Sequence, residues 1–107
     1  MAHVLAFIPD LLFGSRVKAS LEAAGNKVEL VSRPREGGDV LIVDLTAEAE
    51  QRIAQVGHRS NVIAFYSHVE REVRDRAREA GFDMVIPRSR MAREGAEVVR
   101  RLLGADE

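Results

Sequence analysis

The sequence predicts a single three-layer α/β domain built on a five-stranded parallel sheet. Three observations favour this fold class: short apolar runs alternate with segments of helical period, a glycine follows each helical segment, and two central runs are almost continuously apolar. Strands that alternate with helices form parallel sheets, and continuous apolar runs are typical of strands covered on both faces. The chain has 107 residues, enough for one shared core, so we expect one domain over 1–107.

The predicted strands are short and rich in β-branched residues, whereas the segments between them place apolar residues on one helical face. Strands are expected at 3–8, 27–32, 39–45, 61–66 and 83–87. The apolar helix faces comprise Phe13, Val17, Leu21 and Ala24, then Ala49, Ile53 and Val56, then Val69, Val73, Ala77 and Ala80, and finally Val98 and Leu102.

Capping residues support these boundaries. Asp10, Thr46 and Ser67 each stand where a strand ends and a helix should begin, which is the place of an N-cap. Glu70 follows Ser67 by three residues, the spacing of a capping box. The glycines at the helix ends, where a left-handed residue is favoured, are Gly25, Gly57, Gly81 and Gly104.

The connection between the second and third strands, 32–39, shows no helical pattern. Seven extended residues reach roughly 23 Å. Returning along a strand while shifting by two strand spacings needs about 20 Å. A taut extended link is therefore feasible, and antiparallel pairing of these two strands is the alternative.

Composition excludes several classes of protein. The chain has no cysteine, which rules out disulfides, thiolate catalysis and cysteine metal sites. No apolar stretch approaches the roughly 18 residues that a membrane span requires. The segment 1–10 lacks a basic lead and is interpreted as a first strand, not a signal peptide. Without a signal peptide or a membrane span, the protein is expected to be cytoplasmic and not bound to a membrane. The net charge of −1 also argues against binding of nucleic acid by this protein alone.

Arginine is concentrated in the last third of the chain, with acidic residues interspersed. This pattern indicates solvated helix faces with ion pairs, and a basic docking surface is the alternative. The arginines are Arg71, Arg74, Arg76, Arg78, Arg88, Arg90, Arg93, Arg100 and Arg101.

Asp44 ends the third predicted strand, Ser67 follows the fourth, and Met84-Val85-Ile86-Pro87 stands at the end of the fifth, 83–87. Five units with these residues at the strand ends resemble the receiver domains of response regulators over essentially the whole chain. The resemblance implies a flavodoxin-like sandwich with strand order 2-1-3-4-5, here with the second crossover helix missing or very short, and a signalling protein that is not an enzyme. It also implies that Asp44 accepts phosphate from a histidine kinase, that Ser67 is the switch hydroxyl, and that Asp10 and Asp44 contribute to a Mg²⁺ site.

Two departures weaken the implied chemistry. Receivers carry adjacent acids at the end of the first strand, whereas Ile8-Pro9 stand here and only Asp10 follows. The family's lysine on the fifth strand is replaced by Ile86, and Arg88 would need a different approach to the site. Because the hold on Mg²⁺ depends on the few carboxylates offered, metal affinity should be low. We therefore predict a stand-alone receiver-like module that is not phosphorylated, or is an atypical regulator, and acts through protein–protein contacts.

The residues at the carboxyl ends of the strands are expected to share one edge of the sheet, where parallel sheets bind ligands. This candidate rim comprises Asp10, Asp44, Ser67, His68 and Arg88. A small anion or metabolite bound at this rim is the alternative to phosphorylation, and helix capping or solvent exposure is the structural alternative for each residue.

The resemblance also implies partners. A kinase or downstream regulator is expected, and the family uses the helix at 70–80 and the strand at 83–87 for output and dimerisation. These segments are dense in Arg and Glu here, so a homodimer with charged pairing is predicted.

Overall fold

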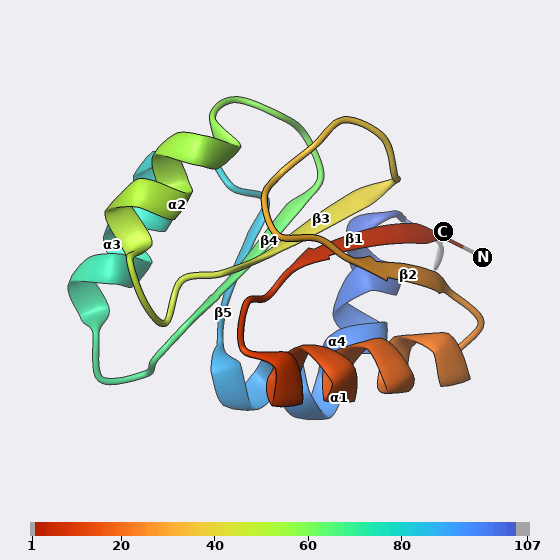
Figure 1. The fold of residues 1–107 in the computed structure, drawn as a ribbon. Coiled ribbons are helices and arrows are strands. Elements are labelled where there is room, and N and C mark those ends of the chain that lie inside the picture. Colours follow the sequence, from red (N-terminus) through yellow and green to blue (C-terminus); the bar gives the residue numbers. More distant parts are fainter. Residues whose placement is uncertain (1, 105–107) are drawn as a thin grey trace.

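The computed structural model describes residues 2–104, which form a five-stranded sheet between two layers of helices (Figure 1). In chain order the elements are β1 (His3–Phe7), α1 (Leu11–Ala23), β2 (Lys27–Leu30), β3 (Val40–Asp44), α2 (Ala49–Val56), β4 (Val62–Tyr66), α3 (Arg71–Glu79), β5 (Met84–Pro87) and α4 (Arg88–Leu102).

The sheet is entirely parallel, with strand order β2-β1-β3-β4-β5, as predicted. In the centre of the sheet, Val4 of β1 lies opposite Val28 of β2 on one side and Val40 of β3 on the other. The strands β2 and β3 flank β1 and do not pair, so the antiparallel alternative is wrong. All residues of β3 and β4 are buried, which agrees with their continuous apolar sequence.

Helices cover both faces of the sheet. On one face, α1 and α4 contribute Phe13, Leu21 and Val98 to a core cluster with the side chains of alternate strand positions. On the other face, Val56 of α2 and Ala77 of α3 complete a second cluster. This arrangement is the predicted three-layer sandwich. Within residues 2–104, every helix is too short or too polar to cross a bilayer.

The link between β2 and β3 contains no helix and runs over the sheet face on which α2 and α3 pack (Figure 1). Gly38 lies so close to the sheet, with φ of +76°, that a Cβ there would stand 3.0 Å from Leu5 Cγ. Asp39 and His3 exchange two hydrogen bonds of 2.7 and 2.8 Å. Arg35 reaches back to Glu29 of β2 at 2.6 Å. The link therefore crosses from β2 to β3 without a helix, as the sequence predicts, but it bends at 32–33, 36 and 38–39 and is not one taut extended segment.

The predicted helix starts are confirmed at one place and wrong at two. Asp10 caps α1 by accepting a hydrogen bond from the Phe13 amide at 3.1 Å. Thr46 is not an N-cap, because its amide and hydroxyl donate to Asp44 and α2 begins at Ala49. The capping box at Ser67 is also absent: the amide of Glu70 donates to the Ser67 carbonyl in a turn, and α3 begins only at Arg71.

The apolar helix faces follow the prediction except at two positions. Val69 precedes α3 and is 73% exposed, and Ala24 is exposed as the C-cap residue of α1. All four predicted C-terminal glycines have positive φ, as expected, but the ψ of −148° places Gly57 outside the left-handed helical conformation.

Candidate functional site

Asp44 stands at the carboxyl end of the central strand β3 and is only 3% exposed. Its Oδ1 accepts hydrogen bonds from the amide and the hydroxyl of Thr46, at 2.8 and 2.5 Å. Its Oδ2 lies 3.8 Å from Nη1 of Arg52. Each carboxylate oxygen of Asp44 therefore faces a donor supplied by the protein itself.

Arg52 is a buried cation that projects from α2 toward the end of β3. Nη1 donates to the main-chain carbonyl of Asp44 at 2.8 Å, and the guanidinium carbon lies 5.7 Å from the centre of the Phe7 ring. The exposed Glu48 carboxylate approaches the guanidinium from outside, at 3.9 Å. Buried charges are stable only where they are paired and hydrogen-bonded, and these contacts supply both conditions.

Sequence reasoning did not identify Arg52 as a site residue. A signal was present, because the position lies three residues after Ala49 and four before Val56, on the apolar face of α2. An arginine on the covered face of a helix needs an internal acceptor, and the carboxyl end of a neighbouring strand is a suitable one.

Asp10 and Arg88 meet at the same edge of the sheet. Besides capping α1, the Asp10 carboxylate lies 3.9 Å from the guanidinium of Arg88, the first residue of α4. That guanidinium also stacks 3.9 Å from the centre of the Phe13 ring. Both contacts of Arg88 join α4 to α1, so a structural role accounts for the position of this arginine at the sheet edge.

Ser67 and His68 lie in the loop that follows β4, at the expected edge. His68 is exposed, and Ser67 is partly buried. Neither side chain forms a hydrogen bond or an ion pair with Asp10, Asp44 or Arg88 within the part of the chain that the structure describes. The structure thus brings Asp10 to Arg88, holds Asp44 with Thr46 and Arg52, and does not unite the five rim residues in one contact network.

The expected Mg²⁺ site at Asp10 and Asp44 stays a prediction, and the contacts of the two carboxylates do not favour it. Among residues 2–104, no three His, Asp or Glu side chains are arranged to hold a metal ion. Asp10 and Asp44 each face a guanidinium, which opposes the binding of a second cation. Ile86, at the place of the family's lysine, is buried in the apolar core and offers no charge.

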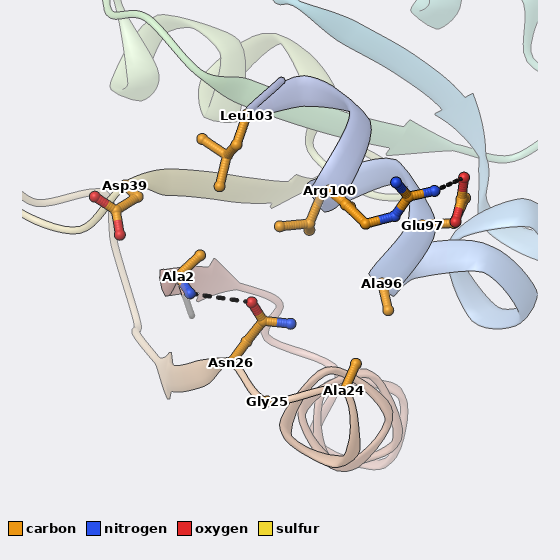
Figure 2. A pocket seen from close by; sticks show the side chains of 10 residues that line it. Ala2, Ala24, Gly25, Asn26, Asp39, Ala96, Glu97, Arg100 and Leu103 are labelled. Atoms are coloured by element: carbon orange, nitrogen blue, oxygen red, sulfur yellow. Dashed lines mark hydrogen bonds and ion pairs between the residues drawn. The ribbon is translucent and has the colours of Figure 1, made fainter. Parts of the chain in front are cut away.

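A pocket of about 780 Å³ lies at the opposite, amino-terminal edge of the sheet, between the end of α1 and the last turns of α4 (Figure 2). Its polar side chains are already engaged. Asn26 accepts from the Ala2 amide at 3.3 Å and donates to the Leu21 carbonyl at 3.0 Å. Arg100 donates to Glu97 at 2.5 Å, and this hydrogen bond lowers the pKa of the Glu97 carboxyl. The pocket is therefore spatially separate from the predicted rim.

Comparisons with known proteins add a fold assignment. No protein-family model matches the sequence, and no curated protein matches it. The receiver domain of the Francisella response regulator 1452 is similar in structure, with a TM-score of 0.74, 15% identity and 100% of both chains covered.

Two structures of the ChxR receiver domain from Chlamydia trachomatis are also similar. One has a TM-score of 0.69 and 15% identity, covering 96% of each chain. The other has a TM-score of 0.66 and 12% identity, covering 96% of this chain and 99% of that one. These similarities extend over nearly every element of the sheet and both helical layers. The chain therefore has the fold of response-regulator receiver domains, with one helix fewer because an extended link joins β2 to β3.

Proposed function

We propose that this protein is a signalling module with a receiver fold that acts by protein–protein contact and is not phosphorylated on Asp44. One observation carries the proposal: the Asp44 carboxylate is buried, with Thr46 bound to one oxygen and Arg52 facing the other. The second expectation, an atypical receiver phosphorylated by a histidine kinase, would require this carboxylate to be free.

The chemistry of phosphoryl transfer explains why these contacts matter. An acceptor carboxylate oxygen must attack phosphorus in line with the leaving group, while cations neutralise the developing charge. The Thr46 and Arg52 donors stabilise the carboxylate in its unreacted state and would have to be displaced. The Asp10 carboxylate, the nearest acid in sequence after β1, caps α1 and lies 3.9 Å from the Arg88 guanidinium, which disfavours a second cation beside it.

The proposal includes no catalytic activity and places the function in docking surfaces. A kinase or a downstream regulator remains the expected partner, and the surface of α3 and β5 is the expected contact. The edge strand β5 supports this location, because Met84 and Val85 are only partly buried there. The homodimer predicted from the sequence is the alternative use of this surface, and sedimentation velocity distinguishes it from the binding of a separate partner.

The decisive experiment is incubation of the protein with acetyl phosphate and Mg²⁺, followed by intact-mass spectrometry. We expect no phosphoryl adduct, while a receiver domain that phosphorylates itself under these conditions serves as the positive control in the same tube. An adduct that disappears in Asp44→Asn would overturn the proposal, because it would show that the carboxylate is accessible and reactive. Asp44→Glu serves as a matched variant that keeps the charge but displaces it.

A further inference from the structure

The helix α3 carries three arginines along one flank: Arg71, Arg74 and Arg78. Residues three and four positions apart are neighbours on a helix surface, so these side chains form a continuous row. Arg71 and Arg78 are exposed, and the Arg74 side chain is 31% exposed. The three are called the arginine row below.

The arginine row lies on the flank of α3 that faces away from α2. Arg76 marks the opposite flank, because it forms an ion pair with Glu50 of α2 at 2.5 Å. At about 100° per residue, each arginine of the row is about 140–160° around the helix from Arg76. Glu72 and Glu79 fall on the Arg76 flank by the same spacing, and Glu79 lies 3.9 Å from Arg76. The charge of α3 is therefore divided in part: Glu72 and Glu79 lie on the flank near α2, whereas Asp75 lies beside the arginine row, about 40° around the helix from Arg71.

The arginine row is poorly neutralised. Arg74 contacts only its neighbour Asp75, at 3.2 Å. Neither Arg71 nor Arg78 forms an ion pair or a side-chain hydrogen bond with any residue in the range 2–104. The cations of α4 differ, because Arg90 pairs with Glu94, and Arg101 pairs with Glu97. The solvated and paired charges expected from the sequence thus describe α4 but not this flank of α3.

An apolar contact point adjoins the start of the arginine row. Val69 is 73% exposed. It lines a shallow hollow of about 360 Å³ together with Val73, Arg71 and two acids, Glu70 and Glu72. The first turn of α3 therefore offers an apolar surface directly beside a free guanidinium.

We propose that this flank of α3 binds an acidic segment of a partner protein, which places an apolar side chain on Val69 and carboxylates along the arginine row. The inference deepens the proposed function by naming the chemistry of the partner. Arginine presents a fork of donors that matches a carboxylate, and charged flanks of this kind set the specificity and rate of association.

Two other occupants fit less well. A second copy of this chain, related by a two-fold axis through α3, would bring the two arginine rows together, and like charges across an interface are unfavourable. A nucleic acid depends on the number of phosphates that the protein neutralises, and three arginines on a protein with a net charge of −1 offer few such contacts. Both occupants are nevertheless distinguished by the experiment.

The probe is a short fluorescein-labelled peptide of alternating leucine and glutamate, with a glutamine-for-glutamate version as its control. Fluorescence anisotropy measures binding to the full chain and to two double variants of equal charge. Arg71→Glu/Arg78→Glu changes the arginine row, whereas Arg16→Glu/Arg33→Glu changes two exposed arginines that make no ion pair within residues 2–104. Circular dichroism checks that both double variants are folded.

We expect the glutamate peptide to bind more tightly than the glutamine peptide and less tightly as salt is raised. Arg71→Glu/Arg78→Glu should weaken binding roughly tenfold or more, and Arg16→Glu/Arg33→Glu should leave it within about twofold. Equal weakening by both double variants, or equal binding of both peptides, would overturn the inference.

Two further results would also overturn it. One is displacement of the peptide by a single-stranded oligonucleotide at lower concentration than by unlabelled peptide. The other is self-association in sedimentation velocity that Arg71→Glu/Arg78→Glu abolishes, since it would assign the flank to a second copy of the chain. A phosphoryl adduct on Asp44 would refute the proposed function without affecting any of these readouts.

Discussion

The guanidinium of Arg88 in α4 lies 3.9 Å from the centre of the Phe13 ring in α1. It also lies 3.9 Å from the carboxylate of Asp10, which caps α1. Phe13 in turn packs against Phe65 of β4, with ring centres 5.2 Å apart. A cation, an aromatic pair and a helix cap thus form one continuous contact between α1, α4 and the sheet. This contact occupies part of the edge where the family resemblance implies phosphate chemistry.

Replacing Arg88 by alanine should lower the free energy of unfolding by about 0.5–1.5 kcal/mol, because it removes a cation–π contact and a weak, half-exposed ion pair. Arg88→Lys should recover part of this loss. Urea denaturation measures both variants. Arg93→Ala is the matched control, since the Arg93 side chain is 67% exposed. An Arg88→Ala protein as stable as that control would contradict the assigned contact.

Replacing Arg52 by methionine should destabilise the fold by about 2–4 kcal/mol, because it leaves the buried Asp44 carboxylate without its cation. The double-mutant cycle with Asp44→Asn isolates the pair, and we expect the two substitutions to be less costly together than their sum. Denaturant midpoints provide the measurement. Strict additivity would show that the two side chains do not interact.

Gly38→Ala should destabilise the protein by about 1–3 kcal/mol, since the new Cβ would meet Leu5 and the conformation disfavours an L-residue. Gly37 provides a control in the same link. It also has positive φ, of +103°, but a Cβ added there would have no atom within 4 Å, so Gly37→Ala adds backbone strain alone. Thermal unfolding of the two variants should rank Gly38→Ala as the less stable, and the reverse order would contradict the close approach.

The link should also make stability sensitive to acid. The hydrogen bond from His3, aided by Arg35, holds the pKa of the Glu29 carboxyl below its usual value of 4.5. A carboxyl with a lower pKa in the folded state contributes stability above its unfolded pKa, and this contribution is lost as pH falls through the folded value.

Glu29→Gln should therefore reduce stability at neutral pH and make progressively less difference below about pH 4.5. Urea titrations of both proteins across this range provide the test. A difference in unfolding free energy that stays constant from neutral to acidic pH would assign the effect of the substitution to something other than the charge of Glu29.

The alternation of short apolar runs with segments of helical period was enough to predict the parallel sheet. The buried runs around Val40–Asp44 and Val62–Tyr66 are apolar over both faces, and few arrangements other than a covered parallel sheet accommodate them. The length of the 32–39 connection showed only that a parallel crossover without a helix is feasible, because chain reach is fixed by covalent geometry, and it left antiparallel pairing open. These features depend on the backbone and on burial, which local sequence specifies well.

The polar contacts at the strand ends were harder to predict. Threonine is a residue type favoured at N-caps, but the amide and the hydroxyl of Thr46 donate to the Asp44 side chain two residues earlier and so do not cap α2. Ser67 and Glu70 have capping-box spacing, yet a turn intervenes and delays α3 to Arg71. The pairing of Asp44 with Arg52 depends on how α2 packs against β3, which spacing along the chain does not specify.

The contact between Arg52 and Asp44 has a consequence for how long a signal from this protein would last. A receiver that stores a phosphoryl group keeps a record of its stimulus for as long as that covalent bond survives. In the function proposed here, the Arg52 guanidinium lies against the Asp44 carboxylate and no phosphoryl group is bound there. No covalent bond then stores the signal, and no hydrolysis step ends it. The strength of the output would then follow the number of copies in the cell and the amount of partner available, so regulation would act on synthesis and degradation of the protein.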